Sequence, residues 1–314
     1  MPHETPSPAG SCRIRHTQLL FKKEAGRCLA PLEVGIRIGD LVALMMCAEY
    51  VKRFEGRRII FQLMSRTHQS LKADILFKHT IDGILLEEGP VYGLDDPDLP
   101  DIYDPGPLWM ASTYYHQRHG ADIIPRLNLD PACYGGPELA WGSYVVFHPL
   151  FDPSYNTPRG MDATFVNAFC DQLAAALGER ALVITDQPDR IRSKIRVITS
   201  DSLYDLACVI GHARAYIGGD TGFTHLAAAG RVPELHGLYG PRFERSARDA
   251  FADVCFDDLV NPFASWGKYL GTPMDTRPKC DPAATRMQLH ILEGNRLEAA
   301  EMEAIIGQLS APRP

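Results

Sequence analysis

The clearest pattern of hydrophobic and polar positions runs from residue 143 to residue 240. Short apolar runs alternate there with longer segments in which apolar residues recur every three or four positions. These runs predict strands within 143–150, 181–186, 195–200, 215–219 and 234–240. The longer segments predict helices within 161–178, 201–213 and 220–230. Strands that alternate with helices favour a parallel, doubly wound α/β sheet.

A second organised region lies near the N-terminus. Leu41, Leu44, Met45 and Ala48 follow helical spacing, so we expect a helix from about Leu41 to Phe54, followed by a strand in "RRIIFQL". The middle of the chain, "EEGPVYGLDDPDLPDIYDPGPLW", is rich in Pro, Gly and acidic residues, which argues against a helix or a central strand. "DPACYGGPELAW" is typical of a linker, and a last apolar helix is expected in "RLEAAEMEAIIGQL".

Composition and charge narrow the class of protein. The 314 residues are 45% hydrophobic and 23% charged, with a net charge of −7, so nucleic acid is not the expected partner. No apolar stretch is long enough to cross a membrane, although contact with a membrane surface stays open. The first ten residues lack the order of a signal peptide, and the eight cysteines contain no C-x-x-C. We therefore expect a cytoplasmic protein with reduced thiols.

The stretch "YIGGDTGFTHLAAAG", from Tyr216 to Gly230, carries the most specific chemistry. Glycines and polar residues stand at the end of an expected strand and open a helix of small residues. The first turn of a helix presents unpaired N–H groups and a positive dipole end, so it can hold a phosphate. Asp220, Thr221, Gly222, Thr224 and His225 are the candidate binding residues. Taken alone, the motif favours an ordinary structural interpretation, with Asp220 as an N-cap, the glycines as a tight turn and His225 as a surface residue.

The run "SLYDLACVIGHARAYIGGDTGFTHLAAAGRVPELHGLYGP" resembles the nucleotide-binding half of glycosyltransferase family 9, the ADP-heptose:lipopolysaccharide heptosyltransferase group. The residues that match that pattern position by position are Asp220, Thr221, Gly222, His225, Gly240 and Pro241. The Gly-Asp turn that opens the first helix of the family is matched by Gly39 and Asp40 in "IRIGDLVALMMCAEYV". The resemblance implies that Asp40 faces the acceptor as general base, with Gly39 beside it. Asp40 alone would be read as an N-cap.

The resemblance implies a GT-B-like fold, with two Rossmann-like domains facing a cleft and a reduced N-terminal domain. The expected parts are a disordered tail (1–12), an acceptor-binding domain (13–140), a nucleotide-sugar-binding domain (141–290), and a C-terminal helix and tail (291–314). The implied reaction is transfer of a sugar from a nucleotide-diphosphate sugar to a hydroxyl group, with inversion and without a metal or other cofactor. A glycan, a lipid-linked molecule or a small metabolite could each be the acceptor.

One loop departs from the family pattern. The family carries a Lys-x-Trp-Pro-like segment near the phosphates, whereas this chain has "FHPLFDPSYNTPRGMD", with neither Lys nor Trp. Arg159 is the expected substitute for the cation, with His148 and Asn156 as lesser candidates. Arg242, just after the Gly-Pro loop, is a further candidate contact to a phosphate, as is Arg245.

Other interpretations remain open at this point. Asp96 and Asp98 form an Asp-x-Asp pattern that could hold a metal ion, but their Pro-rich setting favours a solvated acidic loop. Tyr114 and Tyr115 could stack on an acceptor sugar or pack in a core. An epimerase or hydrolase of the same architecture is a second possible enzyme. A degenerate nucleotide-sugar-binding scaffold is the non-enzymatic alternative.

Overall fold

The computed structural model describes residues 22–24, 27–32, 38–54, 58–63, 73–81, 83–86, 125–151, 160–219, 221–239 and 287–311. The chain divides into two compact units. Unit 1 contains residues 1–128 and 271–278, and unit 2 contains residues 129–270 and 279–314. Each unit is described by itself.

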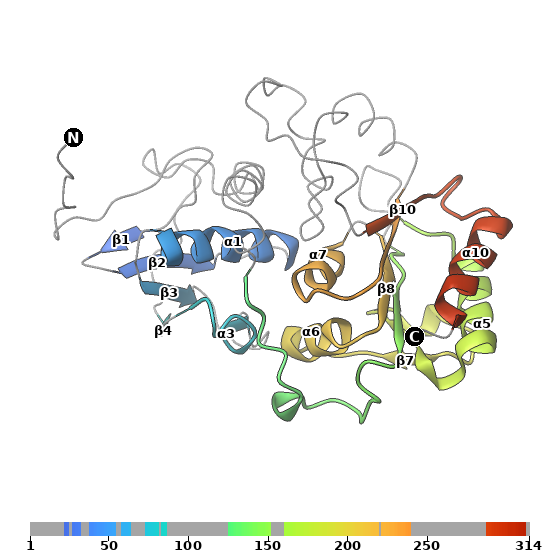
Figure 1. The fold of residues 1–314 in the computed structure, drawn as a ribbon, viewed down its shortest axis with the longest axis horizontal. Helices are drawn as coiled ribbons and strands as arrows, with labels where there is room; N and C mark the ends of the chain where they lie inside the picture. Colours follow the sequence, from blue (N-terminus) through green and yellow to red (C-terminus); the bar gives the residue numbers. More distant parts are fainter. Residues whose placement is uncertain are drawn as a thin grey trace, which may run out of the picture. The chain divides into compact units, whose positions relative to one another are not determined.

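Unit 2 is built on a six-stranded sheet in the order β10-β9-β8-β5-β6-β7, drawn edge-on in Figure 1. Every neighbouring pair is parallel. The strands are β5 (Val145–His148), β6 (Ala181–Ile184), β7 (Arg196–Ile198), β8 (Ala215–Gly218), β9 (Leu235–Tyr239) and β10 (Met287–Ile291). Counted from β5, this is the doubly wound order 3-2-1-4-5-6. The expectation of a parallel, doubly wound α/β fold is confirmed.

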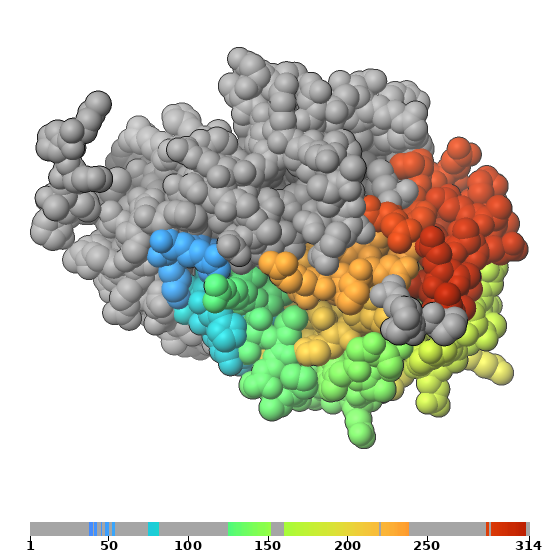
Figure 2. Space-filling model, viewed as in Figure 1, coloured from blue at the N-terminus to red at the C-terminus, as the bar shows by residue number. Residues whose placement is uncertain are grey.

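Helices cover both faces of this sheet. They are α5 (Ala163–Leu177), α6 (Leu203–Gly211), α7 (Gly222–Ala229) and α10 (Ala299–Ser310), with short 3-10 turns η2 (Pro131–Cys133), η3 (Gly178–Arg180) and η4 (Pro188–Arg190). Because strand side chains alternate between faces, Val145 and Phe147 pack in the core under α5 and α10, whereas Val146 packs in the core under α6 and α7. The C-terminal segment, red in Figure 2, lies at the surface beside the yellow-green segment that contains α5.

Two helices of unit 2 begin at side-chain caps. Asp162 accepts hydrogen bonds from the amides of Thr164 and Phe165 at 2.9 and 3.0 Å, which lowers the pKa of its carboxyl group. Ser202 accepts one from the amide of Asp205 at 3.2 Å. A cap of this kind typically stabilises a helix by about 1 kcal/mol. Both helices lie within the segments in which the sequence predicted helices.

The segment expected to be a linker packs against the core of unit 2 through a few of its residues. Asp130 caps η2, and Leu139 is buried. The ring of Trp141 lies 5.1 Å from that of Tyr134 and 5.0 Å from that of His212, centroid to centroid. The linker interpretation is therefore wrong for this stretch, because the aromatic residues between its glycines and prolines pack against the α6 side of the sheet.

Strand β10, which lies beside β9, was not expected from the sequence. A row of polar contacts joins these two strands to α10. The row starts at Glu234, whose carboxylate lies 3.0 Å from Nε2 of His236. His236 and His290 approach at 3.0 Å, and His290 lies 2.8 Å from the carboxylate of Glu301. This row connects the C-terminal helix to the β9–β10 edge of the sheet.

Unit 1 contains a four-stranded sheet in the order β1-β2-β3-β4. Its elements are β1 (Lys22–Glu24), β2 (Arg27–Leu32), α1 (Ile38–Phe54), β3 (Arg58–Leu63), α3 (Ala73–Leu76) and β4 (Gly83–Leu86). β2, β3 and β4 are parallel, and β1 is antiparallel to β2. Helix α1 buries Leu41, Val42, Met45 and Ala48. The spacing predicted Leu41, Met45 and Ala48, and the side chain of Leu44, also predicted, lies outside the described residues.

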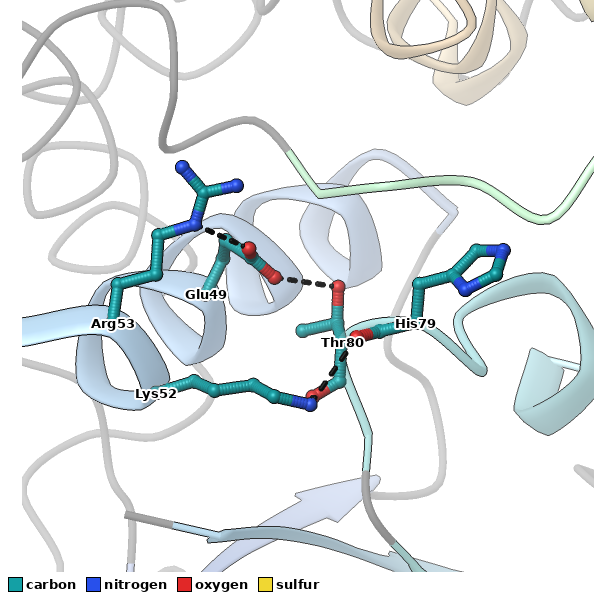
Figure 3. Close-up of polar contacts among 5 residues, drawn as sticks. All are labelled: Glu49, Lys52, Arg53, His79 and Thr80. Carbon is teal, nitrogen blue, oxygen red and sulfur yellow. Dashed lines mark hydrogen bonds and ion pairs between the residues drawn. The ribbon is translucent and has the colours of Figure 1, made fainter. Parts of the chain in front are cut away.

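A polar cluster fixes the second half of α1 (Figure 3). Glu49 is only 3% exposed, and its carboxylate accepts hydrogen bonds from the hydroxyl of Thr80 at 3.0 Å and from Nε of Arg53 at 2.6 Å. Lys52 donates to the carbonyl oxygens of His79 and Thr80 at 3.2 and 3.0 Å. These contacts join α1 to the turn that follows α3.

Candidate nucleotide-sugar site

The order of the strands in unit 2 marks one place where a ligand is expected. In a doubly wound sheet the ligand binds beyond the carboxyl ends of the strands at which the order reverses. Here these strands are β5 and β8, which are neighbours in the sheet. Their last residues, His148 and Gly218, are paired with each other. The phosphate motif found in the sequence follows directly after Gly218.

The loop after β8 is held in a tight conformation. A Cβ atom on Gly218 would lie 2.4 Å from the hydroxyl oxygen of Tyr216, and one on Gly219 would lie 3.3 Å from the carbonyl oxygen of Leu238. The hydroxyl of Thr224 donates to the carbonyl oxygen of Gly219 at 2.5 Å. The sequence suggested Thr224 as a hydroxyl donor to a phosphate, but its hydrogen is used here to hold the loop.

The first turn of α7 is arranged as an anion site requires. Thr221 is the N-cap residue, in extended conformation, and its side chain caps no amide. The amide of Thr224 bonds to the carbonyl oxygen of Thr221 at 3.1 Å. The amides of Gly222 and Phe223 come too early in the helix for an i→i−4 bond, so they point out of its positive end.

His148 lies beside this turn. Its side chain is buried, its Nδ1 is 3.3 Å from the hydroxyl oxygen of Thr221, and its ring meets that of Phe223 edge-on at 4.7 Å. Burial lowers the pKa of His148 to about 4, so the imidazole is neutral near pH 7. Because a neutral ring carries no charge, His148 does not replace the missing lysine as a cation.

Arg190 is a fixed positive charge that the sequence analysis missed. It follows β6, whose carboxyl end lies at the same edge of the sheet. Its guanidinium carbon is 4.3 Å from the ring centre of Phe151, and its Nη1 donates to the carbonyl oxygen of Phe151 at 3.3 Å. Phe151 belongs to the loop after β5. The signal that could have found Arg190 is its position after an apolar strand in a doubly wound pattern.

The structure brings some of the predicted site residues together and leaves others undescribed. Thr221, Gly222, Thr224 and His225 lie within the start of α7, and the His225 side chain is 2% exposed. Gly39 is buried, and Asp40 lies in the first turn of α1, with only its backbone described. The following candidates lie outside the described residues: Asp220, Arg159, Gly240, Arg242, Arg245, Asn156, Asp96, Asp98, Tyr114 and Tyr115.

Two further findings concern metals and membranes. Among the residues that the structure describes, no group of three or more His, Cys, Asp or Glu side chains could hold a metal ion. Within the same part of the chain, no helix is long and apolar enough to cross a membrane.

Residues 174–248 match the model of glycosyltransferase family 9 (heptosyltransferase). The matched segment runs from the end of α5 through β9 and includes the whole motif at α7. This match confirms the resemblance found in the sequence and supports a nucleotide-sugar glycosyltransferase over a non-catalytic scaffold. No curated protein sequence matches this chain.

Solved structures of similar fold include the ADP-heptose lps heptosyltransferase II of E. coli. At 12% identity and a TM-score of 0.51, the similarity covers 90% of this chain and 99% of that one. E. coli heptosyltransferase WaaC with ADP-2-deoxy-2-fluoro heptose is 14% identical with a TM-score of 0.46, over 90% of this chain and 98% of that one. The iron-containing dodecameric glycosyltransferase TibC from enterotoxigenic E. coli is 16% identical, with a TM-score of 0.42, over 68% and 57%. The first similarity shows the GT-B-type fold.

Proposed function

We propose that this chain is a glycosyltransferase that moves a sugar from a nucleotide-diphosphate sugar to an acceptor hydroxyl, with inversion and without a metal ion. One observation carries the proposal. The D-T-G-x-x-H-L-A-A-A motif opens α7 at the point where the strand order reverses, inside the segment that matches family 9. Sequence motif, topology and local helix geometry therefore support the same ligand at the same place.

The diphosphate is proposed to bind at the first turn of α7. The amides of Gly222 and Phe223 and the hydroxyl of Thr221 are the donors, and Asp220 and Gly240 flank them in the chain. As the bond from the anomeric carbon to the phosphate oxygen breaks, negative charge grows on the diphosphate. Fixed donors aimed at such charge are worth about 3–4 kcal/mol each. Arg159 and Arg242 remain the proposed cations, and Arg190 joins them because it stands on the same edge of the sheet.

Asp40 is proposed as the general base. The acceptor oxygen forms a bond to the anomeric carbon while its proton passes to the Asp40 carboxylate, and the diphosphate leaves with the bonding electron pair. A single displacement of this kind inverts the anomeric centre. The support for Asp40 is its place beside Gly39 in the first turn of α1, the helix that follows the parallel strand β2.

The acceptor is proposed to be a glycan, a lipid-linked molecule or a small metabolite with a free hydroxyl group. We propose the cytoplasm as the site of action, with contact to a membrane surface where the acceptor is lipid-linked. Cys170 and Cys208 are buried free thiols. Thiols that stay unpaired are usual in a reducing compartment, which supports this location.

Ligand-dependent melting with ADP-, GDP-, UDP- and dTDP-sugars tests the proposed function. We expect one nucleotide to stabilise the protein, and the matching sugar to be transferred when acceptors are supplied. Stabilisation without turnover under a broad acceptor screen would favour a binding protein. Turnover of the donor without any acceptor would favour an epimerase or hydrolase.

Two variations sharpen this test. Turnover is expected to survive EDTA, because the amides of α7 and the arginines take the role of a metal ion. A complete loss that added metal restores would direct attention to Asp96 and Asp98.

His225→Ala is expected to weaken binding of the nucleotide diphosphate about tenfold, the size of one hydrogen bond to a charged group. Unchanged affinity would remove His225 from the site.

A further inference from the structure

His148 contacts two residues at the start of α7, Thr221 and Phe223. It is the last residue of β5 and is paired with Gly218, at the end of β8. Its side chain is 7% exposed, with Nδ1 3.3 Å from the hydroxyl oxygen of Thr221. The ring meets that of Phe223 at an angle of 82°. One buried side chain thus touches the N-cap residue and the second residue of the helix.

The hydroxyl of Thr221 is not used as it is in most helices. A Thr at the N-cap ordinarily accepts a hydrogen bond from an amide in the first turn. Here the backbone has the extended N-cap conformation, with φ −137° and ψ 163°, but the side chain makes no such bond. Its hydroxyl oxygen lies 3.3 Å from Nδ1 of His148 instead, and it also interacts with the hydroxyl of buried Tyr216. The amides of Gly222 and Phe223 are therefore not covered by the cap and can meet an anion.

The neutral state of His148 determines what it can do for Thr221. A neutral imidazole has one N–H group and one acceptor nitrogen. With the hydrogen on Nδ1, the ring donates to the Thr221 oxygen, and the hydrogen of the Thr221 hydroxyl is left to donate elsewhere. With the hydrogen on Nε2, Thr221 donates to His148 and can only accept from a ligand. A phosphate oxygen needs a donor, so the first arrangement suits a diphosphate site.

We propose that His148 is a positioning residue for the donor diphosphate, acting through Thr221. Nδ1 of His148 donates to the Thr221 oxygen, turns the hydroxyl hydrogen toward a phosphate oxygen, and keeps the side chain of Thr221 away from the first-turn amides. This inference rests on the proposed function and deepens it. His148 touches no reacting atom.

Calorimetric titration of the full chain with inorganic pyrophosphate tests this role. His148→Phe keeps a ring against Phe223 but has no polar atom for Thr221. His148→Asn loses the ring but places an amide nitrogen near the position of Nδ1. Thr221→Val removes the hydroxyl. We expect H148F and T221V each to weaken binding about tenfold, and H148N to stay within about threefold of the wild type.

The double variant H148F/T221V separates positioning from general loosening of the fold. If His148 acts through Thr221, the double variant binds about as weakly as T221V alone. Wild-type affinity in H148F, or losses that multiply to about a hundredfold in the double variant, would overturn the inference. Should H148F fail to melt cooperatively, His148→Gln replaces it, because its amide reaches toward the Nε2 position, and the same losses are expected.

Ligand binding by the wild type distinguishes a failure of the role proposed for His148 from a failure of the proposed function. If the wild type binds pyrophosphate and is stabilised by a nucleotide sugar, but H148F and H148Q bind as it does, only the role of His148 is wrong. If the wild type binds neither pyrophosphate nor any nucleotide sugar, the proposed function fails, and the inference that rests on it fails too.

Discussion

Helices α7 and α1 both start just after a parallel strand, and both carry a residue proposed to act in transfer, but their described polar side-chain contacts gather at opposite ends. The contacts of α7 gather at its start, where Thr221 meets His148 and the Thr224 hydroxyl holds Gly219. The described polar contacts of α1 gather in its second half, where Glu49 and Lys52 join the helix to the turn after α3.

This difference matches the different roles proposed for the two helices. A diphosphate site depends on fixed dipoles, so its donors gain from being held before the ligand arrives. A general base needs only to reach one proton in the bound complex. The comparison therefore predicts that changes at α7 affect donor binding, whereas changes at α1 affect turnover or the stability of unit 1.

The largest expected effect is that of Asp40→Asn on turnover. Asparagine keeps the size of the side chain but cannot take a proton, so kcat should fall about 10²- to 10⁴-fold. The affinity for pyrophosphate should not change, because the proposed diphosphate site lies on α7. Steady-state kinetics and titration measure the two quantities. Asp171→Asn, an equal change at an exposed position of α5, is the matched control. A kcat within threefold of the wild type would exclude Asp40 as the base.

The second prediction concerns stability in acid, and it distinguishes the units because the buried histidines among the described residues belong to unit 2. Burial lowers the pKa of His148 and of His236 to about 4 each, from about 6.5. The unfolded chain therefore binds more protons between pH 6.5 and pH 4, so the free energy of unfolding falls as the pH drops through this window. The loss should approach about 3 kcal/mol for each histidine below pH 4.

Chemical denaturation at pH 7, 5.5 and 4.5 measures this loss. His148→Asn serves as the internal control, because asparagine does not titrate. Its unfolding free energy should depend less steeply on pH than that of the wild type. An equal slope in both proteins would mean that His148 is not the neutral, buried group described here.

Features of the fold that depend on residues close together in the sequence could be predicted. Features that depend on contacts between residues far apart in the sequence could not. The strands and helices between residues 143 and 240 follow from local alternation, and the starts of α5 and α6 from Asp162 and Ser202. Strand β10 was missed because "MQLHI" is short and half polar, and only its pairing with β9 makes it a strand. The stretch 130–141 was interpreted as a linker because its glycines and prolines are typical of loops. The packing of Tyr134 against Trp141 could not be inferred from that composition.

The candidate site was predicted in part for the same reason. The motif at α7 is contiguous, so its residues could be grouped from sequence alone. The contact of His148 with Thr221 joins positions 73 residues apart, and it requires that β5 and β8 be neighbours. The use of the Thr224 hydroxyl inside the loop, and the place of Arg190 on Phe151, likewise depend on three-dimensional packing.

The third prediction concerns Glu49, in the second half of α1. Glu49→Ala leaves the Thr80 hydroxyl without its buried acceptor, and it removes the partner of Arg53. A loss of about 2–3 kcal/mol in the free energy of unfolding is expected. Glu49→Gln is the matched control, because its amide oxygen can still accept from the Thr80 hydroxyl and the loss should be smaller. Pyrophosphate binding at α7 should be unchanged in both variants. Weaker binding in E49A would mean that the two helices are not independent.

The smallest expected effect comes from Thr224→Val at the start of α7. Valine keeps the shape of the side chain but cannot donate to the carbonyl oxygen of Gly219 or accept from Tyr216. The free energy of unfolding should fall by about 1–2 kcal/mol, and pyrophosphate should bind a few-fold more weakly because the loop after β8 is less fixed. Thr224→Ser keeps the hydroxyl and should retain both properties. If T224V lost stability but bound pyrophosphate normally, the loop after β8 would not need to be fixed before the ligand binds. The contacts of α7, like those of α1, would then contribute only to stability.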